Sequence, residues 1–117
     1  MHILVIEDHD ATRLGLMRLL QRAGHEVRTA ATMAEARSLL GSHAFHLLVS
    51  DCSLPDGKGS DLVELARARG AKFIMLSATP TADGEFDAFL MKPLCVDELE
   101  QTIARVMSTV ETTSVIA

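Results

Sequence analysis

Residues 2–8 read HILVIED, a short apolar run that ends in two acidic residues. An apolar run of this length is typical of a strand buried on both faces of a sheet, so we expect a strand at His2–Ile6. The arrangement recurs further along the chain, where apolar runs also end at a polar or charged residue. These runs are FHLLVSD at 45–51, KFIMLS at 72–77 and AFLMKP at 88–93.

Helical patterns lie between the apolar runs. Strands are expected at His2–Ile6, Glu26–Ala30, Phe45–Ser50, Lys72–Leu76 and Ala88–Met91. Helices are expected from Asp10 or Thr12 to about Ala23, over Thr32–Gly41, over Ser60–Arg69 and over Val96–Met107. Strands that alternate with helices indicate βαβ crossovers. We therefore predict a three-layer α/β fold with a five-stranded parallel sheet.

Local signals set the expected helix boundaries and inner faces. Asp10 or Thr12 can cap the first helix and Gly24 can end it. The segment from Thr32 to Glu35 forms a capping box for the second helix. Pro55, Gly57 and Gly59 indicate a loop after the third strand. The expected inward residues are Leu14, Met17 and Leu20 in the first helix and Leu99, Ile103 and Val106 in the last.

Two segments depart from the regular alternation. The crossover over 78–87 contains Pro80 and Gly84 and is too short for a regular helix with two loops, so we expect one helical turn at most or an open loop. After Met107 the sequence STVETTSVIA has no periodic apolar face. We therefore assign residues 1–107 to the domain and 108–117 to a flexible tail or the start of a linker.

Composition excludes several classes of function. The 117 residues, 48% hydrophobic and 23% charged, fit one globular domain. Eleven basic and sixteen acidic residues give a net charge of −5, and there is no Trp or Tyr, which argues against direct nucleic-acid binding. No apolar run reaches membrane-spanning length, and two cysteines do not indicate a disulfide scaffold. These features favour a cytoplasmic protein with no membrane partner.

Charged and polar residues follow the predicted strands at the edge where their carboxyl ends meet. They are Glu7 and Asp8, Asp51, Ser77 and Lys92. Ligands of open parallel sheets bind at this edge. Three adjacent carboxylates are unfavourable unless a cation neutralises them, and Mg²⁺ binds a few carboxylates together with phosphate oxygens. The sequence therefore predicts a Mg²⁺ and phosphate site, with Lys92 facing the anion.

These residues resemble a known family. ILVIED at 3–8, LLVSDCSLPDGKG at 47–59, FIMLSA at 73–78 and FLMKPL at 89–94 are similar to the motifs of CheY-like receiver domains, which occur in two-component response regulators and hybrid histidine kinases. The motifs stand in the family's order and span about nine-tenths of the chain. The resemblance implies a flavodoxin-like fold and a phosphorelay function.

The resemblance also implies a role for each site residue. Asp51 matches the phosphoacceptor, which takes a phosphoryl group from a phosphohistidine on a histidine kinase or phosphotransfer protein. Asp8, Asp51 and the backbone carbonyl of Ser53 would bind Mg²⁺, and Glu7 would act through a metal-bound water. In this family the domain assists its own phosphorylation and dephosphorylation but is not otherwise an enzyme.

The remaining implied roles concern binding of the phosphoryl group and the conformational switch. Lys92 would pair with a phosphoryl oxygen and Ser77 would donate a hydrogen bond to another. Backbone N–H groups near Cys52 and Ala78 would assist them. Phe89 matches the switch aromatic, which turns inward when the hydroxyl moves. We interpret the Cys52 side chain itself as a buried structural group.

One departure leaves alternatives open. The short crossover removes most of the family's fourth helix, which belongs to its usual dimerisation and output face. We therefore expect a monomer when the protein is unphosphorylated. A degenerate receiver that acts as a phosphorylation-independent interaction module is the alternative. A phosphatase with an aspartyl nucleophile is disfavoured, because it needs a second acid where Ser53 stands.

Overall fold

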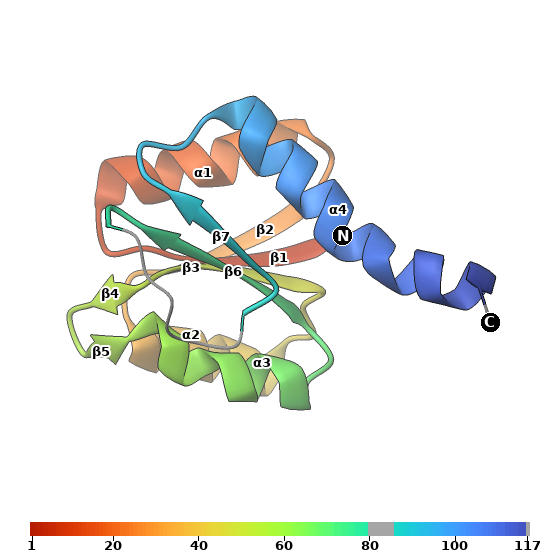
Figure 1. Ribbon diagram of the computed structural model, residues 1–117. Helices are drawn as coiled ribbons and strands as arrows, with labels where there is room; N and C mark the ends of the chain where they lie inside the picture. Colours follow the sequence, from red (N-terminus) through yellow and green to blue (C-terminus); the bar gives the residue numbers. More distant parts are fainter. Residues whose placement is uncertain (80–85, 117) are drawn as a thin grey trace.

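The computed structural model describes the backbone of residues 1–79 and 86–116 and the side chains of residues 1–79 and 86–108. A five-stranded parallel sheet lies at its centre, in the strand order β2-β1-β3-β6-β7 (Figure 1). The strands are β1 (His2–Ile6), β2 (Glu26–Ala30), β3 (Leu47–Asp51), β6 (Lys72–Ser77) and β7 (Ala88–Met91). The predicted parallel sheet is confirmed.

Helices cover both faces of the sheet and make the three predicted layers. Figure 1 shows α1 (Asp10–Arg22) and α4 (Val96–Ile116) on one face. On the other face lie α2 (Met33–Ser42) and α3 (Val63–Ala68), the latter preceded by the 3-10 turn η1 (Gly59–Leu62). Ser60–Arg69 is thus not one α-helix as predicted, because its first turn is wound more tightly.

The three central strands β1, β3 and β6 are mainly apolar because both of their faces are buried. In β1, Ile3 and Val5 join the core cluster that contains α1 and α4 residues. Leu4 and Ile6 join the cluster that contains α2 and α3 residues. Successive side chains of a strand point to opposite faces, so each central strand supplies both cores.

The buried face of α1 differs from the predicted one. Leu14 is 42% exposed, whereas Leu16 and Leu20 are buried against the sheet. Leu16 and Leu20 are four residues apart and therefore lie on the same side of the helix. The prediction was correct for Leu20 and wrong for Leu14.

The start of α1 also differs from expectation. The N-cap residue is His9, which makes no side-chain capping hydrogen bond, and neither Asp10 nor Thr12 is the cap. Asp10 lies inside the first turn, where its carboxylate pairs with Arg13 at 2.6 Å. Its negative charge there is favourable for the helix dipole. Gly24 follows the helix with φ +95°, as a stop signal requires.

The loop predicted around Pro55 and Gly57 contains a small hairpin. Strands β4 (Ser53–Leu54) and β5 (Gly57–Lys58) pair antiparallel. At its turn, the Asp56 carboxylate accepts hydrogen bonds from the backbone N–H groups of Met33 and Ala34, at 2.8 and 3.0 Å. Two free donors at the start of α2 are satisfied in this way. The hairpin therefore fixes α2 beside the end of β3.

The predicted capping box of α2 is present. The Thr32 hydroxyl accepts a hydrogen bond from the Glu35 N–H at 3.2 Å. The Glu35 carboxylate in turn accepts from the Ala31 N–H at 3.1 Å. The box and Asp56 together satisfy the first turn of the helix.

The last helix is longer than predicted. Leu99, Ile103 and Val106 form its buried face as expected, but α4 continues past Met107 to Ile116. No Gly or Pro stands between these residues to end the helix. The assignment of 108–117 as a tail or linker stays a prediction. Among the described helices, none combines the length and apolar character needed to cross a membrane.

The crossover between β6 and β7 is short. It runs from Ala78 to Asp87, and its described residues 78–79 and 86–87 are not helical. Residues 80–85, on which the expected loss of a helix falls, lie outside the described residues. Asp87 anchors the start of β7, because its carboxylate accepts from the Phe73 N–H at 2.8 Å.

Replacing Asp56 by asparagine is expected to lower the free energy of unfolding at neutral pH. The hydrogen bonds from Met33, Ala34 and its own backbone, with the charge of Arg37, lower the pKa of Asp56 below its ordinary value of 3.8. The stabilisation is therefore present above pH 3.8 and is lost as pH falls through the lowered pKa. Urea unfolding of both proteins along a pH series measures the difference.

Asp61→Asn is the matched control, because Asp61 is an exposed acid of the neighbouring η1 turn. It should lower the free energy of unfolding by less than Asp56→Asn, because it removes only the interaction of an exposed charge with the start of a helix. Equal free energies of unfolding for the wild type and Asp56→Asn at neutral pH would show that the charge of the Asp56 carboxylate does not stabilise the start of α2.

Candidate functional site

Four neighbouring strand ends bring the predicted residues to one edge of the sheet. Glu7 and Asp8 follow β1, Asp51 ends β3, Ser77 ends β6 and Lys92 follows β7. The register places Asp51 opposite Leu76 and Ser77 opposite Met91. Parallel pairing of these strands therefore brings together site residues that are as far apart in the sequence as Glu7 and Lys92.

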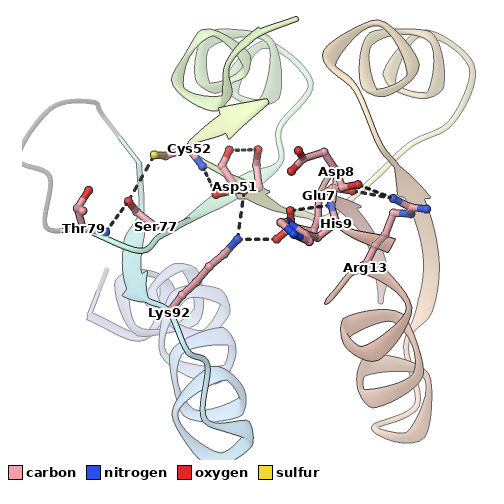
Figure 2. A network of polar contacts seen from close by, with 10 residues as sticks. Glu7, Asp8, His9, Arg13, Asp51, Cys52, Ser77, Thr79 and Lys92 are labelled. Atoms are coloured by element: carbon pink, nitrogen blue, oxygen red, sulfur yellow. Dashed lines mark hydrogen bonds and ion pairs between the residues drawn. The ribbon is translucent and has the colours of Figure 1, made fainter. Parts of the chain in front are cut away.

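The Lys92 side chain links two of the three carboxylates. Its ammonium nitrogen lies 2.6 Å from Glu7 Oε1 and 3.2 Å from Asp51 Oδ2. Figure 2 shows Lys92 reaching from below the sheet edge to a point between them. Glu7 is fully buried, and the side chains of Asp51 and Lys92 are 14% and 23% exposed. This ammonium neutralises negative charge that the fold has taken out of water.

The environment keeps Lys92 charged. Burial by itself lowers the pKa of Lys92, but hydrogen bonds and charges from Glu7 and Asp51 outweigh burial and raise that pKa above 10.5. Lys92 therefore carries its positive charge at any physiological pH and can attract a phosphate oxygen.

Backbone contacts fix the Asp51 carboxylate from the other side. Asp51 Oδ1 accepts a hydrogen bond from the Cys52 N–H at 2.9 Å. The Asp51 carbonyl accepts from the Ser50 hydroxyl at 2.9 Å. A Cβ on Gly59 would collide with this carbonyl, so only glycine allows the chain to pass so close. Asp51 is thus held in one orientation.

Arg13 joins helix α1 to the end of β1. Its guanidinium donates to the Glu7 carbonyl at 3.0 Å and to the Asp10 carboxylate at 2.6 Å. Arg13 was not among the site residues predicted from the sequence. The available signal was its position four residues after His9, in the first turn of the helix that begins beside the acidic pair.

The acidic residues fit a hard divalent cation. Ligand atoms of Glu7, Asp8 and His9 lie within 4.8 Å of one another. Both Glu7 oxygens already have partners, Lys92 and the His9 N–H. The Asp8 carboxylate, in contrast, has no hydrogen bond or ion pair within the described part of the chain. Carboxylates of this kind, beside a strand end, are the ligands that Mg²⁺ prefers.

A pocket of about 540 Å³ lies over these groups. Its lining includes Asp8, Asp51, Ser53, Ser77, Ala78 and Lys92. Ser53 is an exposed residue at the start of β4. With Cys52, seven of the predicted residues therefore share one opening, which is large enough for a phosphoryl group and water.

Ser77 is close to Asp51 in the fold but is bonded elsewhere. Its hydroxyl oxygen accepts from the Thr79 N–H at 3.2 Å and from the Cys52 thiol at 3.4 Å (Figure 2). The Cys52 side chain is half-buried and lines the pocket. Cys52 is thus less buried than predicted, but its side chain also packs against the core cluster on the α2 and α3 side, so its interpretation as a structural group stays a prediction.

Phe89 lies apart from this pocket. It is half-buried in β7 and packs beside Phe86, with ring centroids 6.1 Å apart. Both rings pack against the core cluster on the α2 and α3 side of the sheet. Its switch role stays a prediction.

The family follows from comparison with known proteins. A family model described as the response regulator receiver domain matches residues 3–104. The chain belongs to the response regulator receiver family. It is 30% identical over 113 residues to the sensor histidine kinase RcsC of Salmonella typhi, a match that covers 89% of this chain and 12% of RcsC.

Solved receiver domains have the same fold. The receiver domain of the hybrid histidine kinase CckA is 32% identical with a TM-score of 0.79, covering 91% of this chain and 98% of that one. A CheY-like receiver from Methanospirillum hungatei JF-1 is 28% identical with a TM-score of 0.87, covering 96% and 97%. This receiver domain therefore has the flavodoxin-like fold that its motifs predicted.

Replacing Lys92 by methionine is expected to destabilise the receiver domain by about 1–3 kcal/mol, because the buried Glu7 carboxylate loses its ammonium partner. In the double variant Glu7→Gln/Lys92→Met no buried charge remains at Glu7, so part of this stability should return. Urea unfolding curves of the three proteins provide the measurement.

Lys72→Met is the control, because the Lys72 ammonium lies 3.9 Å from Asp87 in a more exposed pair. That substitution should cost about 1 kcal/mol or less. If Lys92→Met and Lys72→Met lower the free energy of unfolding by the same amount, the ion pair between Lys92 and Glu7 contributes no more to stability than an exposed pair.

Proposed function

We propose that Asp51 accepts a phosphoryl group from a phosphohistidine and that this receiver domain serves in a cytoplasmic two-component phosphorelay. The observation that carries the proposal is the Lys92 ammonium shared between the buried Glu7 and Asp51, beside a pocket lined by Asp8. A charged lysine next to a fixed carboxylate suits the binding of an anion, and of the two carboxylates that Lys92 contacts, Asp51 is the one that lines the pocket.

In the proposed reaction an Asp51 oxygen attacks the phosphorus atom. The new O–P bond forms as the P–N bond to the donor histidine breaks, and the electron pair of that bond leaves on the imidazole. The product on the receiver domain is an acyl phosphate. Hydrolysis later returns the Asp51 carboxylate and releases phosphate.

Neighbouring groups have separate tasks in this step. Lys92 pairs with one phosphoryl oxygen. The backbone N–H groups near Cys52 and Ala78, together with the Ser77 hydroxyl, donate hydrogen bonds to the other phosphoryl oxygens. Asp8, Asp51 and the Ser53 carbonyl would hold Mg²⁺, with Glu7 acting through water. The bound cation would neutralise charge and orient the phosphoryl oxygens. The domain thus supplies an acceptor and assists its own modification rather than turning over a separate substrate.

Incubation with Mg²⁺ and acetyl phosphate should add one phosphoryl group to the wild-type protein. Intact-mass spectrometry measures the adduct. Asp51→Asn and omission of Mg²⁺ should each abolish it, because they remove the nucleophile and the cation that neutralises the acidic cluster. A folded wild-type protein that takes no phosphoryl group from acetyl phosphate or from a histidine kinase would instead support the phosphorylation-independent interaction module.

A groove beside the acceptor pocket suits the protein that donates the phosphoryl group. This groove, of about 640 Å³, lies between α1 and the start of α4 and is lined mainly by apolar residues. Thr12, Ala78 and Lys92 line both the groove and the acceptor pocket. A histidine kinase or phosphotransfer protein seated in it would bring its phosphohistidine to Asp51.

Gly15→Arg is expected to block this docking. Gly15 lines the groove and has open space where its Cβ would stand, so the fold should tolerate the substitution. Transfer from a histidine kinase that phosphorylates the wild type should slow about tenfold or more, whereas acetyl phosphate should react normally.

Gly41→Arg is the matched control, since Gly41 also stands in open space in a helix but on α2. It should leave both reactions unchanged. Equal transfer rates from the kinase to the wild type and Gly15→Arg would place the docking surface elsewhere.

A further inference from the structure

The Ser77 hydroxyl is held away from the acceptor by two donors. Its oxygen accepts from the Cys52 thiol and from the Thr79 N–H. The Asp51 carboxylate is bonded instead to the Cys52 N–H and Lys92, and no contact between Ser77 and Asp51 stands among the hydrogen bonds of the described residues. Ser77 is 2% exposed, so water competes little for its hydroxyl.

Cys52 contacts both partners of the proposed chemistry. Its backbone N–H binds Asp51 Oδ1 at 2.9 Å, and its side chain reaches Ser77 at 3.4 Å. The two contacts are chemically separate, because any residue except proline keeps the N–H whereas only a side chain with a donor can bind Ser77. Substitution at position 52 can therefore change the hold on Ser77 without removing the contact to Asp51.

We propose that the Cys52 thiol is a positioning group that keeps the Ser77 hydroxyl turned away from Asp51 until a phosphoryl group arrives. This inference rests on the proposed function, in which Ser77 donates to a phosphoryl oxygen. Figure 2 shows the Ser77 hydroxyl pointing toward Cys52 and Thr79 rather than toward Asp51. We infer that the Ser77 side chain rotates toward Asp51 to donate to the phosphoryl group, and that loss of the thiol hydrogen bond during this rotation adds to the barrier for phosphorylation.

The size of the effect follows from the strength of the bond. A thiol is a weak donor, so its hydrogen bond lies at the low end of the usual net range. Loss of the bond is expected to accelerate phosphorylation roughly two- to fivefold. The thiol thus sets how readily the domain responds but is not needed for the reaction.

Two substitutions at position 52 separate the hydrogen bond from side-chain volume. Cys52→Ala removes the donor, whereas Cys52→Ser removes a similar volume but keeps a donor on Cβ. With acetyl phosphate and Mg²⁺, Cys52→Ala should react roughly two- to fivefold faster than wild type, and Cys52→Ser at or below the wild-type rate. Cys95→Ala, at the other free and exposed cysteine, should match the wild type.

A second readout does not depend on phosphorylation. The Thr79 N–H donates to the Ser77 oxygen, so its hydrogen exchange reports whether Ser77 stays in place. Exchange at Thr79, measured by NMR on the unphosphorylated proteins, should be roughly two- to fivefold faster in Cys52→Ala than in wild type or Cys52→Ser.

The two readouts distinguish the possible failures. Equal phosphorylation rates and equal Thr79 exchange in the alanine and serine variants would overturn the positioning role while leaving Asp51 as the acceptor. If neither the wild type nor any variant is phosphorylated, the proposed function is wrong, and the proposed effect of the Cys52 thiol on phosphorylation is wrong with it. Faster Thr79 exchange in Cys52→Ala would then show only that the thiol holds Ser77.

Discussion

The Lys92 ammonium between Glu7 and Asp51 is the interaction on which the site depends. Glu7 is fully buried at the end of β1, and Asp51 is largely buried at the end of β3. Two carboxylates in such surroundings repel each other and lose hydration. Lys92, 2.6 and 3.2 Å from them, offsets both effects. The fold can therefore keep the Asp51 carboxylate beside Glu7, a second acid that is shielded from water.

The surrounding backbone holds this charge arrangement in place. Arg13 secures the end of β1 through the Glu7 carbonyl, and Ser50 and Gly59 secure the end of β3. Farther out, Asp56 joins the hairpin after β3 to the start of α2. These contacts fix the strand ends, while the pocket above them stays open to solvent. A fixed sheet edge with an open pocket suits the proposed reaction, in which a partner protein delivers a phosphoryl group.

The two ends of the site differ in how firmly they are held. Glu7, Asp51 and Lys92 are joined by charged hydrogen bonds, which are the strong ones. Among the residues that the structure describes, the Ser77 hydroxyl is bonded to a thiol and to a local backbone N–H. The weaker contacts lie beside the short crossover that follows β6. In the proposed switch, a hydroxyl held in this way changes partners when a phosphoryl group is attached to Asp51.

Sequence alone determined which residues follow each strand. The apolar runs are local signals, and parallel strands that alternate with helices must bring their carboxyl ends to one edge. Glu7, Asp8, Asp51, Ser77 and Lys92 could therefore be predicted together, and the motifs identified the family. The inward face of α1 and the length of α4 were less well predicted, because side-chain burial and helix ends depend on what packs against them.

Tertiary structure decided which of these groups bond to each other. Glu7 and Lys92 are 85 positions apart, and nothing local pairs them. The sequence around Cys52 shows no partner for its thiol, and only the folded chain places that thiol 3.4 Å from the Ser77 hydroxyl, 25 positions away. Local periodicity encodes strands and their ends. Contacts between side chains from different strands depend on register and packing, which exist only in the folded chain.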